Sequence, residues 1–181
     1  MGYLISEFPF ISSRMNHRRG PPANQQRSTT QVKQVVRTEK TRRDFRRIAR
    51  ESSGEAFDTE DGDKMFFAYN GSDLIGVGSL HLAARTPLGD ESMFLSDHFH
   101  NINFVFVKSH HKHQGHGSCL LRFMLKYVHQ NQKKSVRVQS AAKAVNFFQK
   151  HGFESVGEPF ETLCGGSPLF NTLVNMQRTA I

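Results

Sequence analysis

Short apolar segments follow one another along most of the chain, and their spacing separates strands from helices. Segments that are continuously apolar, or that alternate apolar with polar residues, predict strands at residues 31–37, 65–69, 74–83, 98–107, 135–140, 153–156 and 169–177. The sequence Phe104-Val-Phe-Val107 is apolar at every position, as expected for a strand in the middle of a sheet. Asn70-Gly71-Ser72-Asp73 predicts a hairpin turn between the second and third strands.

Three other segments have the spacing of amphipathic helices. Phe45, Ile48 and Ala49 follow Thr41-Arg-Arg-Asp44, a capping-box pattern, and predict a helix over residues 42–51. A second helix starts near Gly117 and carries its apolar face on Leu120, Leu121, Met124, Leu125 and Val128. A third covers residues 141–151 and is closed by Gly152, a common C-terminal cap. This order of strands and helices predicts an α/β fold with a mixed sheet.

The N-terminal residues differ in composition from the rest of the chain. Residues 1–31 contain Pro21-Pro22, many polar side chains and no sustained periodicity, so we expect a flexible, disordered tail and one domain at residues 32–181. No apolar run approaches the roughly 20 residues of a transmembrane segment, and no secretory signal is recognisable. The two isolated cysteines, Cys119 and Cys164, suit a reducing compartment, and we expect a cytoplasmic protein.

The segment 112-KHQGHG-117 joins the apolar strand to the second predicted helix. The first N–H groups of a helix are unpaired and carry a partial positive charge, so this end favours an anion. Gly115 and Gly117 have no Cβ and let a ligand approach the backbone, which suits a pyrophosphate. The segment lacks both the P-loop sequence and the third glycine of the dinucleotide fingerprint.

On this segment the chain resembles the GCN5-related N-acetyltransferase (GNAT) superfamily, whose acetyl-CoA motif is Gln/Arg-x-x-Gly-x-Gly/Ala after a strand that ends in Val. The first matching block is 105-VFVKSHHKHQGHGSCLL-121, in which Lys112 replaces Gln or Arg, and the second is 136-VRVQSAAKAVNFFQKHGFESVG-157. The resemblance extends over residues 32–178. It implies a single GNAT-like domain, with a mixed, mostly antiparallel sheet flanked by helices, that moves acetyl from acetyl-CoA to a primary amine by direct transfer.

The resemblance also implies which residues bind the cosubstrate. They are Phe106, Val107, Lys112, His113, Gln114, Gly115, His116, Gly117, Ser118, Phe148 and Lys150. Two positions depart from the family pattern. Ala141 stands where an Asn usually meets the pantetheine arm, and Phe148 stands where a Tyr often protonates the departing thiolate.

For catalysis, the resemblance implies that the backbone N–H of Val107 or a neighbour stabilises the oxyanion. The carboxylate that often acts as base is missing, because Asn103 and Phe104 hold the expected positions. His100 is our candidate base, since histidine accepts a proton near neutral pH, with the following alternatives: His98, Asp97, Glu91 and the acidic loop.

Charge is unevenly distributed along a chain whose net charge is +8. Residues 51–110 carry ten acidic and three basic side chains. In the resembling family the loop after the first helix borders the acceptor, and here it holds Glu55, Asp58, Glu60, Asp61 and Asp63. An acidic rim would attract a cationic amine, either a small molecule or a peptide.

Three other interpretations compete with this one. The histidines of the loop (His110, His111, His113 and His116) could bind zinc or nickel, but no Cys, Asp or Glu beside them completes a site, so we expect no metal. The departures at Ala141 and Phe148 would suit a CoA-binding protein with little catalysis. A basic module that binds nucleic acid has support from five arginines but from no recognised motif: Arg42, Arg43, Arg46, Arg47 and Arg50. We expect acetyl-CoA and an amine as partners, no stable nucleic acid, and a monomer or homodimer.

Overall fold

A mixed sheet with helices on both faces forms the core of the protein. The computed structural model describes residues 30–83, 98–162 and 170–180, and the tail predicted at residues 1–31 lies almost entirely outside them. The elements are β1 (Thr30–Val35), α1 (Glu39–Ser53), β2 (Lys64–Asn70), β3 (Asp73–His81), β4 (His100–Val107), η2 (Ser109–His111), α2 (His116–Asn131), β5 (Val136–Ala141), η3 (Ala142–Ala144), α3 (Val145–Gln149), β6 (Glu154–Ser155), β7 (Phe160–Glu161) and β8 (Thr172–Arg178).

The strands form one sheet in the order β1-β2-β3-β4-β5-β8-β6, with β7 also paired to β8. Every pairing is antiparallel except the pairing of β4 with β5, which is parallel. The predicted turn is confirmed, since Asn70 and Asp73 are partners at the end of the β2–β3 hairpin. The predicted α/β class, with a mixed and mostly antiparallel sheet flanked by helices, is therefore confirmed.

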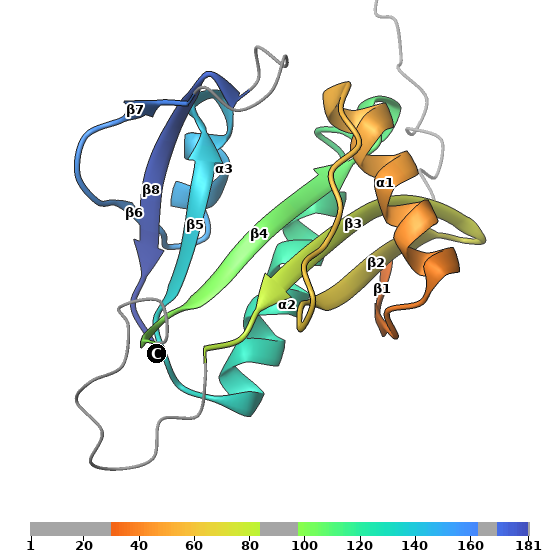
Figure 1. The fold of residues 1–181 in the computed structure, drawn as a ribbon, viewed down its shortest axis with the longest axis horizontal. Coiled ribbons are helices and arrows are strands. Elements are labelled where there is room, and N and C mark those ends of the chain that lie inside the picture. The colour runs from red at the N-terminus through yellow and green to blue at the C-terminus, as the bar shows by residue number, and fades with distance from the viewer. Residues whose placement is uncertain (1–29, 84–97, 163–169, 181) are drawn as a thin grey trace, which may run out of the picture.

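The two faces of the sheet bury two separate clusters of apolar side chains. Figure 1 shows α1 on one face of the sheet and α2 on the other. On one face, Phe45, Ile48 and Ala49 of α1 pack against Met65 of β2 and Val77 of β3. On the other face, α2 contributes the following side chains to the larger cluster: Leu120, Leu121, Met124 and Val128. This cluster also holds Phe148 of α3, so α2 and α3 cover the same face.

Two helix boundaries differ from those predicted. Helix α1 begins three residues earlier than predicted, because Thr38 is the N-cap and Thr41 is the third helical residue whose hydroxyl bonds back to the Thr38 N–H. Both positions are threonine, so the sequence pattern fits either one. The third predicted helix is shorter, since strand β5 extends through Ala141 and a 3-10 turn precedes α3. No helix among the described residues is long and apolar enough to cross a membrane.

Candidate functional site

Strands β4 and β5 touch at one end and separate at the other. Only three residue pairs join them, and the last is Ile102 with Val138. Beyond this pair β5 continues along β8, while β4 stays with β3, so the two strands diverge (Figure 1). The divergence begins at a bulge, because Ile102 faces Leu80 and Phe104 faces Ser79, which leaves Asn103 as an extra residue in β4.

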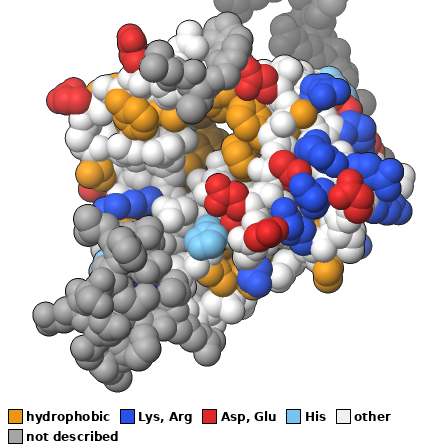
Figure 2. Space-filling view, viewed as in Figure 1, with side chains coloured by type: hydrophobic (Ala, Val, Ile, Leu, Met, Phe, Trp, Pro, Cys, Tyr) orange, Lys and Arg blue, Asp and Glu red, His pale blue; other side chains and the backbone are white. Residues whose placement is uncertain are grey.

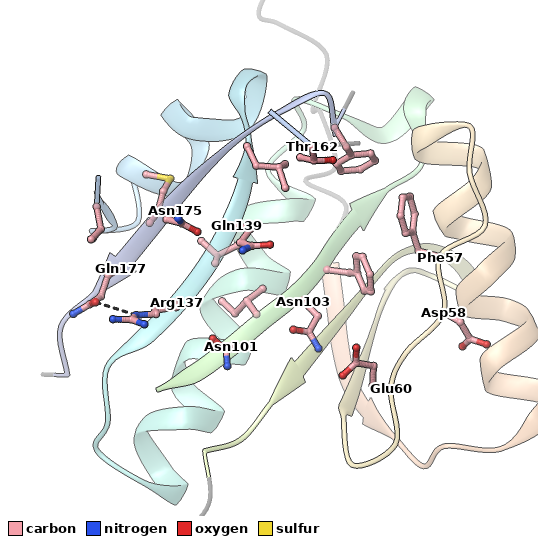
Figure 3. Close-up of a pocket in the computed structure, with 17 residues that line it drawn as sticks. Phe57, Asp58, Glu60, Asn101, Asn103, Arg137, Gln139, Thr162, Asn175 and Gln177 are labelled. Atoms are coloured by element: carbon pink, nitrogen blue, oxygen red, sulfur yellow. Dashed lines mark hydrogen bonds between the residues drawn. The ribbon is translucent and has the colours of Figure 1, made fainter. Parts of the chain in front are cut away.

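A cleft of about 660 Å³ lies on the α1 side of this divergence. Figure 2 shows it as a hollow on the face of the molecule bordered by hydrophobic side chains. At one end it is aromatic, since Phe57, Phe104 and Phe170 line it and the Phe57 ring centroid lies 5.2 Å from that of Phe104 and 5.0 Å from that of Phe170. Elsewhere carboxamide side chains from three strands line it (Figure 3): Asn101, Asn103, Gln139, Asn175 and Gln177. Sequence reasoning missed these amides, because they become neighbours only through the sheet order.

The edge of β4 that faces the divergence carries backbone groups without a ladder partner from β5. The Lys108 N–H donates to the Ile75 carbonyl of β3 at 2.9 Å. Because successive residues of a strand point their N–H groups to opposite sides, the N–H of Val107 points away from β3, as does that of Val105. An N–H directed at the gap is the geometry that the predicted oxyanion donor Val107 requires.

The glycine loop lies at the end of β4 and leads into α2. Gly115 is the N-cap, its φ is 87°, and neither a side-chain cap nor an acidic residue occupies the first turn. A left-handed φ of this kind suits glycine, which lacks the Cβ that would clash. A Cβ built on Gly117 would lie 3.6 Å from the Phe147 ring and 3.6 Å from Val107 Cγ2, an ordinary contact, so the fold itself does not require glycine there. The unpaired N–H groups remain available for an anion.

Several side chains predicted to hold CoA stabilise the loop itself. Lys112 Nζ donates to the Ser52 carbonyl at 3.0 Å, and Gln114 Nε2 donates to the His110 carbonyl at 3.0 Å. Ser118 Oγ lies 3.1 Å from His151 Nε2 at the other side of the α2 start. These contacts leave the backbone of the loop, rather than its cations, as the main surface that a pyrophosphate would meet.

The remaining predicted cosubstrate residues fall into buried and exposed groups. His113 adopts a φ of 62° and is exposed, as is Lys150. Phe106 is buried against α1, and Phe148 is buried with its ring centroid 5.5 Å from that of Phe153. Phe148 therefore lies in the core, whereas the ring of its neighbour Phe147 would lie 3.6 Å from a Cβ on Gly117.

His116 opens α2 and is buried beneath the loop. Its Nδ1 lies 2.8 Å from Thr30 Oγ1, and its Nε2 has no hydrogen-bond partner among the described residues. Burial lowers the pKa of His116, and the nearby His111 lowers it further. The charged imidazolium is therefore disfavoured in the free protein, and we do not assign His116 a role as a permanent cation.

His100, our candidate base, lies at the start of β4 with no exposed surface. Its Nδ1 accepts a hydrogen bond from the Ala83 N–H at 3.0 Å, and its Nε2 lies 3.2 Å from the Gln132 carbonyl, to which it donates. Both ring nitrogens are engaged, and the side chain does not line the cleft. His100 thus connects β4 with Ala83 and with Gln132, and we do not assign it as the base.

We expect His100 to make stability depend on pH. Burial lowers the pKa of His100, so the unfolded state binds more protons than the folded state below the ordinary pKa of about 6.5. The stability is complete above that pH and decreases as pH falls through it. His100→Gln should lower the free energy of unfolding by about 1–3 kcal/mol at neutral pH and flatten its decrease in acid. Denaturant titrations at several pH values measure both effects, and an unchanged acid slope would contradict the assignment.

The histidines before the helix form one cluster that could accept a metal ion. Asp73, His110 and His111 offer ligand atoms that lie within 4.8 Å of one another. However, Lys108 Nζ lies 3.0 Å from Asp73 Oδ1, and this ammonium already neutralises the carboxylate and would repel a dication. The expected absence of a metal stays a prediction.

Comparisons with known proteins identify the family. The family model for the acetyltransferase (GNAT) domain matches residues 31–163. No curated protein matches the chain. Ard1 from Thermoplasma volcanium has a TM-score of 0.63 at 16% identity over 84% of this chain and 98% of its own. The ribosomal-protein-S18-alanine N-acetyltransferase from Escherichia coli has a TM-score of 0.63 at 9% identity over 83% and 93%.

A third similar structure is FeeM, an N-acyl amino acid synthase from uncultured soil microbes. It has a TM-score of 0.63 at 15% identity, over 83% of this chain and 91% of its own. Identities this low compare folds only, but the family model covers well over half of the chain. The parted strands, the glycine-lined helix start and this match agree, and the chain belongs to the GNAT acetyltransferase family.

Proposed function

We propose that the protein transfers an acetyl group from acetyl-CoA to a primary amine by direct attack. The observation that carries the proposal is that β4 and β5 part beyond Ile102 and Val138, and that the free end of β4, at Val107, lies against Gly117 at the start of α2. A pyrophosphate on the α2 N-terminus leaves the unpartnered edge of β4 to hydrogen-bond the amide groups of the pantetheine arm. The thioester then reaches the cleft, where Val105 and Val107 direct N–H groups at the gap.

The acceptor enters through the cleft, and the charges around it define which amines fit. Two of the five carboxylates of the acidic loop are paired with arginines: Asp61 pairs with Arg37, and Asp58 pairs with Arg42 and Arg46 of α1. Figure 2 shows the resulting mixture of acidic and basic side chains over this part of the surface. Glu60 is the loop carboxylate that lines the cleft and forms no ion pair with any described residue (Figure 3).

An ammonium group is the partner that this carboxylate suits, and the amides provide hydrogen bonds to the rest of the acceptor. The opposite wall presents Arg137, whose guanidinium bonds Gln177 at 3.2 Å and lies 3.4 Å from the centroid of the Phe99 ring. We therefore propose an acceptor with one ammonium group near Glu60 and several polar groups, which is a narrower class than the cationic small molecule or peptide that the sequence suggested.

Glu60→Gln is expected to raise KM for the amine about three- to tenfold at low salt, because it removes one attractive charge and keeps the size of the side chain. The control is Asp61→Asn on the same loop, since that carboxylate is paired with Arg37 and does not line the cleft. Steady-state kinetics at two salt concentrations measure both variants. Equal KM values for Glu60→Gln and the unmodified protein would remove Glu60 from acceptor binding.

The proposed function is tested by incubating the protein with acetyl-CoA and a panel of amines that includes amino acids, peptides with a free N-terminus, aminosugars and polyamines. We expect free CoA thiol to accumulate with at least one amine and mass spectrometry to find the acetylated product. Binding of acetyl-CoA without product over the whole panel would favour the second candidate, a CoA-binding protein with little catalysis, for which the buried and hydroxyl-free Phe148 is the supporting observation.

A further inference from the structure

A histidine at the end of β3 is held by a buried carboxylate beside the cleft. His81 Nδ1 lies 3.2 Å from Asp63 Oδ1; the imidazole is 46% exposed, whereas the Asp63 side chain is fully buried. A carboxylate that bonds one ring nitrogen fixes the tautomer and leaves the lone pair of the other nitrogen free to accept a proton. No described residue forms a hydrogen bond with Nε2 of His81.

Asp63 is itself held in place by the residues of the cleft. Its second oxygen, Oδ2, accepts hydrogen bonds from Asn103 Nδ2 at 2.9 Å and from the Glu60 N–H at 3.3 Å. Asn103 is the extra residue at the bulge, and it projects into the same space as Glu60 (Figure 3). The carboxylate therefore connects the histidine to the point where β4 and β5 begin to separate.

The register places the imidazole on the cleft side of the sheet. His81 and Asn101 are direct partners in the antiparallel β3–β4 pair. Partners of this kind project from the same face, with Cβ atoms about 4.5–5.5 Å apart, and Asn101 lines the cleft. Among the described residues, Asp63 is the charged group that contacts the imidazole ring. A second carboxylate, that of Glu60, lies on the adjoining loop, and the β4 side chains nearest to these groups are the neutral amides Asn101 and Asn103.

We propose that His81, positioned by Asp63, is the general base of the transfer; this inference rests on the proposed function. Nε2 takes a proton from the acceptor ammonium, and Asp63 stabilises the imidazolium that forms. The neutral amine then attacks the thioester carbonyl, the C–N bond forms and the C–S bond breaks. The departing thiolate takes the second amine proton, which gives CoA thiol and the amide, and His81 returns its proton to solvent.

The other candidates in the described region fit this role less well. His100 is fully buried and uses both ring nitrogens in hydrogen bonds, whereas the ring of His81 is partly exposed. Glu60 lines the cleft, but an exposed carboxylate is a weak base toward an ammonium at neutral pH. His81 combines an oriented ring with a free nitrogen at the margin of the cleft.

The test uses the full chain, acetyl-CoA and the amine of the panel that is acetylated fastest. His81→Gln should lower kcat/KM by about 100- to 10,000-fold and remove the decrease of activity on the acid side of the pH profile. Thermal stability and the affinity for acetyl-CoA should stay as in the unmodified protein. Added imidazole should restore part of the activity of His81→Ala. The control is His129→Gln on the exposed surface of α2, which should change nothing.

The variant Asp63→Asn tests whether Asp63 orients the His81 ring or only stabilises the fold. Nitrogen NMR of the unmodified protein should show the proton of the neutral His81 ring on Nδ1, and Asp63→Asn should lower kcat and alter this tautomer. If His81→Gln keeps kcat/KM within about threefold and retains the acid limb, the inference is wrong although the proposed function stands. If Glu60→Gln removes the acid limb instead, Glu60 is the base. If the unmodified protein acetylates no amine, the inference fails together with the proposed function.

Discussion

Replacing Gly117 with aspartate is expected to weaken acetyl-CoA binding by about 100-fold or more, without unfolding the protein. The new Cβ meets Phe147 and Val107 at 3.6 Å, which the packing tolerates. A carboxylate in the first turn of a helix interacts favourably with its N-terminus, so it stabilises α2 and at the same time competes with the phosphates for the same N–H groups. Stability and affinity should therefore change in opposite directions, which global damage to the fold could not produce.

Calorimetric titration with acetyl-CoA measures the affinity of this variant, and thermal unfolding measures its stability. Gly117→Ala is the matched control because it adds the same Cβ without the charge. Its affinity should stay within about threefold of the unmodified protein, and alanine should stabilise the helix by about 0.5–1 kcal/mol. Undiminished affinity in Gly117→Asp would mean that the phosphates bind elsewhere.

Gly76→Ala is expected to damage both stability and catalysis, although Gly76 touches no substrate. A Cβ at this position of β3 would lie 2.9 Å from the Phe106 carbonyl oxygen and 3.4 Å from Val107 Cγ2. The backbone of β4 would have to shift, which costs about 1–3 kcal/mol of folding stability. Val107 is the direct partner of Gly76, so its N–H would move relative to the thioester, and a displacement near 1 Å can reduce the rate about 100-fold.

Alanine substitutions at two further glycines, Gly78 and Gly117, should destabilise the protein less than Gly76→Ala. A Cβ at Gly78 would lie 2.7 Å from Met124 Sδ, the end of a flexible side chain, and 3.2 Å from the Phe104 carbonyl oxygen. Because the thioether can move, Gly78→Ala should cost less stability than Gly76→Ala, and Gly117→Ala should cost none. Denaturant unfolding of the three variants gives the order directly. Equal stability of Gly76→Ala and Gly117→Ala would contradict the close approach of β3 to β4.

The sequence predicted features that depend on residues close together in the chain. The glycine loop is one of these, because a strand, Gly115 and the start of a helix follow one another within a dozen residues. Anion binding by this loop stays a prediction. The hairpin at Asn70–Asp73 is another. The start of α1 was misplaced because Thr38 and Thr41 each satisfy the local pattern, and only the hydrogen bonds distinguish the N-cap from the third residue.

Features that depend on register and strand order could not be predicted in this way. The cleft combines Asn103 of β4 with Gln139 of β5 and Asn175 of β8, which are isolated amides in the sequence. The contact of His81 with Asp63 depends on the β2–β3 pairing, and Asn103, which donates to Asp63, is the extra residue at the bulge in β4. The sequence suggested His100 as the base because it lies a few residues before the expected catalytic positions. In the structure His100 is buried and makes two hydrogen bonds, so its role is to stabilise the fold.

The most direct test of the central claim, that the protein binds acetyl-CoA through the start of α2, is thermal unfolding of the unmodified protein with and without acetyl-CoA, and separately with zinc. A ligand that binds only the folded state adds about 2.7 kcal/mol at 100 times its dissociation constant, which raises the midpoint by several degrees. We predict a clear rise with acetyl-CoA and none with zinc. A rise with zinc and no response to saturating acetyl-CoA would show that the histidines bind a metal and that our account of the loop is wrong.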